Sequence, residues 1–355
     1  HASGIVPYMR HSYLFIFMLT MLPALYVQAA PAQRAFSDWQ VTCNNQNFCI
    51  ARNINEHKGL VMTLSRSAGA KTDAVLRIEL GGLATPSAGE PAIAPRLLLD
   101  GEPLALDTRH WQLSPWRLST DDTATINAFL ATIQEKHMIA LNRGKQEISL
   151  DGLKATLLFI DSQQKRVGSE TAWIKKGDDP PLSVPPAPAL KEVAVINPTP
   201  TPLTRQERSD LIDYGTWRMN NSQCSLDPAR REVRVTALTD DKALMMISCE
   251  AGAYNTVDLA WLVSRKKPFA ARPVRLRLPF VAASESSDME LMNAGFDEKN
   301  RELTTLALGR GIADCGIQTR WRFNGQRFRL VRYAEEPSCD NWHGPDAWPT
   351  LWITR

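Results

Sequence analysis

A proline-rich stretch divides the chain into two parts of similar length. Residues 179–204 contain eight prolines. Proline lacks a backbone N–H and interrupts helices, so this stretch predicts neither a helix nor a central strand. We expect a semi-extended linker there. It would join an N-terminal domain at residues 30–178 to a C-terminal domain at residues 205–355, and each part is long enough to bury its own core.

The residues before the first domain have the pattern of a secretory signal peptide. Arg10 precedes an apolar run from Tyr13 to Val27, and small residues follow that run. This order is typical of a leader that is removed on export, with cleavage expected after Ala29. The run is short for a bilayer span, and an uncleaved anchor is the alternative interpretation. We expect residues 1–29 to be a signal peptide with upstream residues. The mature chain is then expected in the periplasm, or secreted, without a membrane span.

Export decides how the cysteines are interpreted. All six lie beyond the predicted leader, and an even number in an oxidising compartment favours disulfides. Closeness in sequence and the domain division select the pairs Cys43–Cys49, Cys224–Cys249 and Cys315–Cys339. The competing hypothesis is a metal site. The chain has no C-x-x-C pair, and the histidines beyond the leader are dispersed, so we predict no metal and no other cofactor.

Alternating apolar residues in the first part predict a sheet with one helix. An Asp100-Gly101 hairpin turn and a helix over Thr123–Lys136 are the clearest local signals. Strands are expected at Trp39–Cys43, Leu76–Leu80, around Ile148 and at Lys154–Ile160.

The second part begins with a helix and continues with strands. Thr204 and Glu207 form a capping box, which predicts a short helix to about Asp213. Short alternating runs then predict strands at Val233–Val235, Leu244–Ile247, Val274–Leu278, Leu306–Leu308 and Trp321–Phe323. The expected fold class is α+β, with two mostly antiparallel β domains that each carry about one helix.

Charge balance and missing motifs exclude several functional classes. Residues 30–178 carry 17 basic and 16 acidic side chains, and residues 205–355 carry 22 and 20. Neither part is basic enough to predict nucleic acid as the partner. The chain also lacks the G-x-S-x-G, H-E-x-x-H and P-loop motifs. We therefore predict no catalytic residue and favour a non-enzymatic role.

The most informative local feature is the segment from Arg320 to Arg329. Asn324-Gly325 lies between two alternating runs and predicts a two-residue turn. The resulting register pairs Phe323 with Gln326, Arg322 with Arg327, Trp321 with Phe328 and Arg320 with Arg329. Since side chains alternate between the faces of a strand, four arginines would crowd one face.

These arginines have two interpretations. Neighbouring carboxylates or water neutralise them, or they form a sheet face that recognises phosphate or carboxylate groups through guanidinium forks. Arg275 and Arg277 form a second row of the same kind, opposite in face to the apolar residues between and beside them.

Two other places are weaker candidates. Gly309-Arg310-Gly311 precedes Asp314 and Cys315, and is either a tight turn that delivers Cys315 to its disulfide or a glycine-lined pocket for Arg310 and Asp314. Near the C-terminus, three tryptophans either complete a small core over a disulfide or form a platform for sugars: Trp342, Trp348 and Trp352.

Together these residues make the chain resemble the exported bacterial proteins of the domain of unknown function 1176 family. The resemblance rests on residues 148–155, 161–166, 309–316, 321–330 and 348–352. It implies an envelope protein of a Gram-negative bacterium. A weaker, local similarity links Phe36–Trp39, with Cys43 and Cys49, to the start of invasion-associated locus B proteins, which implies a role at the host or wall surface. Neither resemblance supplies catalytic residues.

We therefore expect an exported, non-enzymatic binding or interaction protein. Its partner would be an anionic component or glycan of the cell envelope, or a periplasmic protein. The candidate ligand-binding residues are Arg310, Asp314, Arg320, Arg322, Arg327 and Arg329. The alternatives are an envelope-directed hydrolase, with Arg310, Asp314 and His343 at its site, and an inhibitor of a hydrolase.

Overall fold

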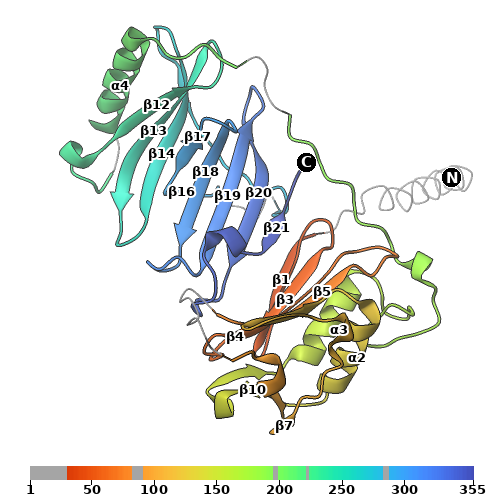
Figure 1. Ribbon diagram of the computed structural model, residues 1–355. Coiled ribbons are helices and arrows are strands. Elements are labelled where there is room, and N and C mark those ends of the chain that lie inside the picture. The colour runs from red at the N-terminus through yellow and green to blue at the C-terminus, as the bar shows by residue number, and fades with distance from the viewer. Residues whose placement is uncertain (1–29, 82–90, 195–198, 221–223, 283–287) are drawn as a thin grey trace, which may run out of the picture.

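The computed structural model describes residues 30–81, 91–194, 199–220, 224–282 and 288–355. The predicted leader, at 1–29, lies outside these residues. Within them the chain forms four sheets whose strand pairs are antiparallel, with three α-helices (Figure 1). The predicted α+β class with two mostly antiparallel β domains is confirmed. No helix in these ranges is both long and apolar enough to cross a membrane.

The N-terminal part is built on a seven-stranded antiparallel sheet. Its order is β1-β2-β3-β4-β5-β9-β8. The strands are β1 (Ala32–Phe36), β2 (Trp39–Cys43), β3 (Cys49–Asn53), β4 (Leu60–Arg66), β5 (Ala74–Leu80), β8 (Gln112–Ser114) and β9 (Arg117–Thr120). The strands expected at Trp39–Cys43 and Leu76–Leu80 are thereby confirmed.

A smaller sheet and two helices complete this part. The sheet has the order β11-β10-β6-β7, and the helices are α2 and α3. Their bounds are β6 (Leu98–Leu99), β7 (Glu102–Pro103), α2 (Thr123–Ile133), β10 (Met138–Leu141), β11 (Gln146–Ser149) and α3 (Leu153–Gln163). Apolar side chains from both sheets and both helices form one continuous core. The Asp100-Gly101 turn, which joins β6 to β7, was predicted correctly. The predicted helix α2 is present, but it ends at Ile133 rather than at Lys136.

The predicted strand at Lys154–Ile160 is wrong, because these residues belong to α3. Leu153, Leu157 and Ile160 are buried along one side of that helix, at helical rather than strand spacing. The end of α3 is fixed to the large sheet by a buried ion pair. Arg66 Nη2 donates to Asp161 Oδ1 at 2.6 Å, and both side chains are almost fully buried. Burial lowers the pKa of Arg66 to about 10.

The C-terminal part contains two further antiparallel sheets. In the first, the order is β12-β13-β14-β15 and β16 also pairs with β14; in the second it is β17-β18-β19-β20-β21. The strands are β12 (Val233–Ala237), β13 (Lys242–Ala251), β14 (Thr256–Ser264), β15 (Ala271–Pro273), β16 (Leu291–Met292), β17 (Gly295–Asp297), β18 (Glu302–Leu308), β19 (Gly316–Phe323), β20 (Phe328–Glu336) and β21 (Thr350–Trp352).

These two sheets enclose an apolar core between them. Leu244 and Leu262 contribute from the first sheet, and Trp321 and Leu330 from the second. The helix α4 (Arg205–Asn220) covers the other face of the first sheet, where a separate core forms. Its capping box is confirmed: Glu207 N donates to Thr204 Oγ1, and Thr204 N donates to Glu207 Oε1, both at 3.0 Å. The helix continues beyond Asp213, where we expected it to end.

The strand predicted at Val274–Leu278 is also wrong. Regular pairing stops at Pro273, and residues 274–278 have no regular secondary structure. The alternation of the side chains persists, because Leu276 is fully buried while Arg275 and Arg277 are exposed. The other strands expected in this part are present.

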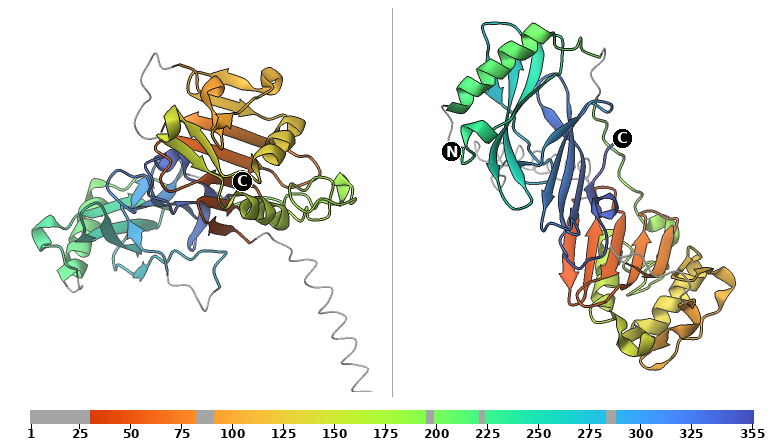
Figure 2. Two further views of the ribbon diagram at one scale, coloured as in Figure 1. Left: turned by 90° about the horizontal axis from the view of Figure 1, so that it is seen from below. Right: turned by 60° about the vertical axis from the view of Figure 1, so that its left-hand side comes forward.

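The linker and the sheets hold the two parts together (Figure 2). The described residues of 179–204 contain a single 3-10 turn, at Pro181–Ser183, as the proline content predicted. The stretch runs beside the C-terminal sheets, where Arg322 Nη1 donates to the backbone oxygen of Val193 at 2.6 Å. Strands β2 and β21 meet directly at the contact between the two parts. The domain boundaries proposed from the sequence stay a prediction.

Candidate functional site

A groove of about 620 Å³ lies at the rim of the C-terminal β sandwich. One wall is formed by β15 and the irregular residues that follow it, and the other by the β19–β20 loop and the start of β20. Linker residues from Lys191 to Ala194 and the C-terminal residues Trp352 and Thr354 complete the lining.

Basic side chains dominate the polar lining of this groove. Among the residues that the structure describes, six cations and one carboxylate, that of Glu192, line it. The cations are Lys191, Arg272, Arg275, Arg277, Arg327 and Arg329. The two arginine rows that the sequence analysis identified about fifty residues apart therefore contribute to the same cavity, from opposite walls.

Arg327 and Arg329 are among the four cations of this lining that have no ion pair in the described part of the chain, with Lys191 and Arg272. The side chains of Arg327 and Arg329 are both exposed. On the facing wall, Arg275 and Arg277 share a single carboxylate: Asp288 lies 3.0 Å from Arg275 Nη1 and 3.6 Å from Arg277 Nε. Within the described ranges, the carboxylates of the groove therefore do not balance its positive charge.

The structure corrects the predicted register of the β19–β20 hairpin. Asn324 Oδ1 accepts hydrogen bonds from the backbone N–H groups of Gln326 and Arg327, both at 3.0 Å. This side-chain cap makes a four-residue loop from Asn324 to Arg327, rather than a two-residue turn. Phe323 consequently pairs with Phe328, and Arg322 pairs with Arg329.

Because the shift is two residues, each side chain keeps its predicted face of the sheet. Arg327, however, moves into the loop and to the mouth of the groove. The corrected register explains why Arg327 and Arg329 line the cavity together with the loop residues Asn324 and Gln326.

The other two of the four predicted arginines, Arg320 and Arg322, are neutralised by carboxylates. Arg322 Nη2 lies 3.0 Å from Glu302 Oε2, and Arg320 Nη1 lies 3.3 Å from Glu302 Oε1. Arg320 also pairs with Asp297. For these two residues, the interpretation that carboxylates interleave with the arginine row is the one that fits the structure.

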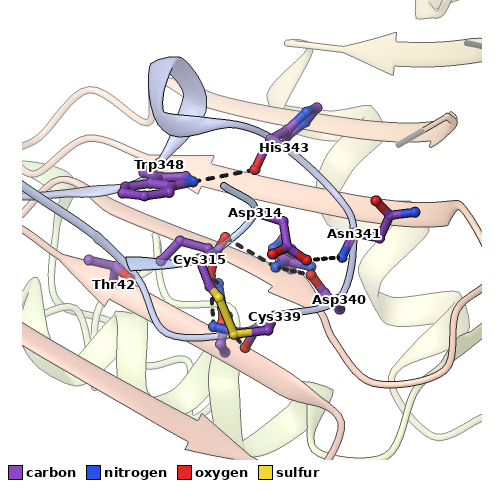
Figure 3. Close-up of polar contacts among 12 residues, drawn as sticks. Thr42, Asp314, Cys315, Cys339, Asp340, Asn341, His343 and Trp348 are labelled. Carbon is purple, nitrogen blue, oxygen red and sulfur yellow. Dashed lines mark hydrogen bonds and ion pairs between the residues drawn. A yellow bond between two sulfur atoms is a disulfide. The ribbon is translucent and has the colours of Figure 1, made fainter. Parts of the chain in front are cut away.

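Asp314 lies beside the Cys315–Cys339 disulfide (Figure 3), and neither Asp314 nor Arg310 lines the groove. Their side chains form an ion pair, and Asp314 Oδ2 also accepts from Asn341 N at 2.8 Å. The hydrogen bond from Arg310 lowers the pKa of Asp314. Asp314 is buried and fully engaged in fixing this turn, and it does not face the groove.

The three predicted disulfides are all formed. Asp314, Cys315 and Cys339 group their potential ligand atoms within 4.8 Å of one another. The two sulfur atoms are bonded to each other, so this group offers no thiolate for a metal ion.

A buried polar cluster that the sequence analysis did not identify lies where the two parts of the chain meet. Arg52 donates to both oxygens of Asp340, at 2.6 and 2.8 Å, and to Glu336 Oε1 at 3.1 Å. His57 Nε2 lies 3.2 Å from Asp340 Oδ2. Burial raises the pKa of Asp340, but the hydrogen bonds from His57 and Arg52 outweigh it and leave that pKa lower than usual.

The C-terminal tryptophans are mainly core residues. Trp342, Trp348 and Trp352 are all buried. Trp342 packs edge-on against His57 at the contact between the two parts, with ring centroids 6.0 Å apart. Trp352 stacks on Phe280 and also lines the groove. The core interpretation therefore fits Trp342 and Trp348, and Trp352 belongs to both the core and the groove.

Comparison with known proteins identifies the family. Residues 33–355 match the family described as "Protein of unknown function (DUF1176)". The chain belongs to this family. It is also 76% identical over 347 residues to the uncharacterized protein YpfG of Escherichia coli (strain K12), an alignment that covers 98% of this chain and 100% of that protein.

No solved structure matches the chain. Two of the stretches that carry the DUF1176 resemblance, residues 321–330 and 348–352, contribute side chains to the groove. The similarity of Phe36–Trp39 to invasion-associated locus B proteins stays a prediction.

Proposed function

We propose that this DUF1176 protein is an exported, non-enzymatic binding protein of the cell envelope, and that it holds an anionic envelope component in the basic groove. The proposal rests on one observation: among the described residues, six cations and one carboxylate line a single cavity. Guanidinium groups bind phosphate and carboxylate through paired hydrogen bonds, so several arginines around one cavity suit an anion.

The disulfides support the exported location. Every cysteine of the chain is paired, and disulfides persist in the periplasm and outside the cell but are rare in the cytosol. Phosphate and carboxylate groups of lipids, wall glycopeptides and acidic proteins are the anions that such a compartment presents.

The corrected register decides which residues a test should change. Reversal of Arg322 would leave Glu302 opposite another carboxylate, so that variant would disturb the sheet. Arg327 and Arg329 are exposed and line the groove without ion pairs among the described residues, which makes them suitable for charge reversal. The matched control is Lys266→Glu with Lys299→Glu, because both lysines are exposed, lie outside the groove lining and change the net charge equally.

Calorimetric titration with pyrophosphate, a soluble multivalent anion, tests the proposal. The unmodified chain should bind, and Arg327→Glu with Arg329→Glu should weaken binding at least about tenfold, since a hydrogen bond to a charged group contributes about 1.5–3 kcal/mol. The lysine control should bind like the unmodified chain. Absence of binding, or equal weakening in the control, would overturn the assignment of the groove.

A further inference from the structure

We infer that the ligand of the groove is an amphipathic anion: a phosphate or carboxylate head group that carries an alkyl or acyl chain. This inference rests on the proposed function and goes further, because it specifies the part of the ligand that the arginines do not contact. It follows from the side chains that lie beneath the basic rim.

The floor of the groove is apolar and continuous with the core between the two sheets. Four of its residues belong to that core: Leu262, Phe328, Leu330 and Trp352. Val274 and Leu278 pack against the same core, are only partly buried and also line the groove. A ligand that enters between the arginines therefore meets hydrocarbon, not further polar groups.

The strand pairing explains why the sandwich opens at this place. β15 is an edge strand of its sheet, and the regular pairing stops at Pro273, after which Val274 N makes one more hydrogen bond to β14, to the backbone oxygen of Ala260. On the other sheet, β21 pairs with β20 at Tyr333 and Ala334, beyond the residues of β20 that line the groove. The β20 residues that line the groove are thus not paired with β21, and the groove lies between them and the residues that follow β15.

The alternation of residues 274–278 separates the two kinds of contact. Leu276 is fully buried and Leu278 lies in the floor, whereas Arg275 and Arg277 project to the exposed side. The same holds on β20, where Phe328 and Leu330 are buried and Arg329 is exposed. Both walls therefore present cations at the rim and apolar side chains below, which is the polarity of a charged head group on a hydrocarbon chain.

The edges of the groove favour a small amphiphile over an added peptide strand. A peptide that extends a sheet needs a row of backbone donors and acceptors. The edge strand β15 has three residues, and its last, Pro273, has no N–H to donate. At the mouth, Arg272 donates to the backbone oxygen of Gln326, which occupies an acceptor that a peptide would use. The cavity volume of about 620 Å³ is that of a site for a small molecule.

A chain-length series on the unmodified protein tests the inference by calorimetry, with butyl phosphate, octyl phosphate and octanol. Each methylene that is fully removed from water strengthens binding about fourfold. Partial burial of the four additional methylenes should therefore make octyl phosphate bind at least about tenfold tighter than butyl phosphate. Octanol should bind at least about tenfold more weakly than octyl phosphate, because it brings no charge to the arginines.

Two variants locate the two ends of the ligand. Arg327→Glu with Arg329→Glu should weaken the binding of both phosphates at least about tenfold. Lys266→Glu with Lys299→Glu should leave the binding of both unchanged. Leu278→Gln should weaken the binding of octyl phosphate several-fold and leave the binding of butyl phosphate unchanged, because Leu278 lines the apolar floor that the longer alkyl chain contacts.

The outcomes separate this inference from the proposed function. Equal affinities for the two phosphates would overturn the inference and leave anion binding in place. Failure of both phosphates and of pyrophosphate to bind would overturn both. Octanol that binds as tightly as octyl phosphate would show that the arginines do not hold the head group, and would also contradict the inference. Because the series uses the unmodified chain, a variant that fails to fold does not decide the result.

Discussion

Replacement of Arg52 by methionine should be among the most destabilising single changes in this chain. Arg52 is 6% exposed, and its guanidinium makes hydrogen bonds of 2.6, 2.8 and 3.1 Å to Asp340 and Glu336. Methionine preserves most of the apolar stem but leaves two buried carboxylates without their cation. Removal of one partner from a buried ion pair costs about 3–5 kcal/mol, so the free energy of unfolding should fall by about that amount at pH 7.

The pH dependence of this loss provides a second test. Burial raises the pKa of Glu336, and the charge of Arg52 opposes that rise. In Arg52→Met the pKa values of both carboxyls should be higher in the folded chain than in the unfolded chain. Folding of the variant then takes up protons. Its loss of unfolding free energy relative to the unmodified chain should be largest near pH 7 and shrink as the pH falls toward about 4, where the carboxyls become neutral.

Urea unfolding followed by circular dichroism measures both effects, and Arg109→Met is the matched control. Arg109 also pairs with a carboxylate, Asp107, but its side chain is 81% exposed. Water screens an exposed pair so that it contributes little to stability, and the control should therefore unfold nearly like the unmodified chain at every pH. If the free energy of unfolding falls no more in Arg52→Met than in Arg109→Met, the buried cluster does not stabilise the contact between the two parts, and the prediction is refuted.

Three other predictions concern stability and redox state. The hydrogen bond from Arg265 lowers the pKa of Glu207 from 4.5 to about 2. Glu207→Gln should therefore lower the free energy of unfolding by about 1–2 kcal/mol near pH 6, and the difference should disappear as the pH falls from 4.5 toward 2. Urea unfolding at several pH values measures this difference, and a difference that stays constant over the range would contradict the prediction. Gly152→Ala should lower the thermal unfolding temperature more than Gly101→Ala does. Both glycines have positive φ, but a Cβ at Gly152 would lie 1.9 Å from a backbone oxygen of β1, whereas a Cβ at Gly101 would have no atom within 4 Å. Thiol titration of the unfolded, unreduced protein should detect none of the six cysteines, and several titratable thiols would contradict the disulfide assignment.

Features set by neighbouring residues were predictable from the sequence. The capping box of Thr204 and Glu207, the helix α2 and the Asp100-Gly101 turn depend on contacts within a few residues, and all three are present. The disulfides followed from export and from closeness in sequence. The pattern also contained a signal for α3 that the strand interpretation overlooked, because Leu153, Leu157 and Ile160 have helical spacing.

Features set by distant residues were not predictable in the same way. The sequence indicated two arginine rows but not that a sandwich rim would bring Arg275 and Arg277 opposite Arg327 and Arg329. It also gave no sign that Glu302 would neutralise Arg320 and Arg322 of the hairpin row, because that pairing depends on the register of a third strand.

The cluster of Arg52 with Asp340 joins residues 288 positions apart. Long-range pairs of this kind follow from the packing of the two parts, which no local pattern encodes.

The location of a bound anion tests the central claim most directly. A crystal of the chain soaked with tungstate, an electron-dense analogue of phosphate, shows where the anion binds through its anomalous scattering. We predict a peak in the groove between Arg327 and Arg329 on one wall and Arg275 and Arg277 on the other. Peaks that lie only outside the groove, with none among these four guanidinium groups, would contradict the account.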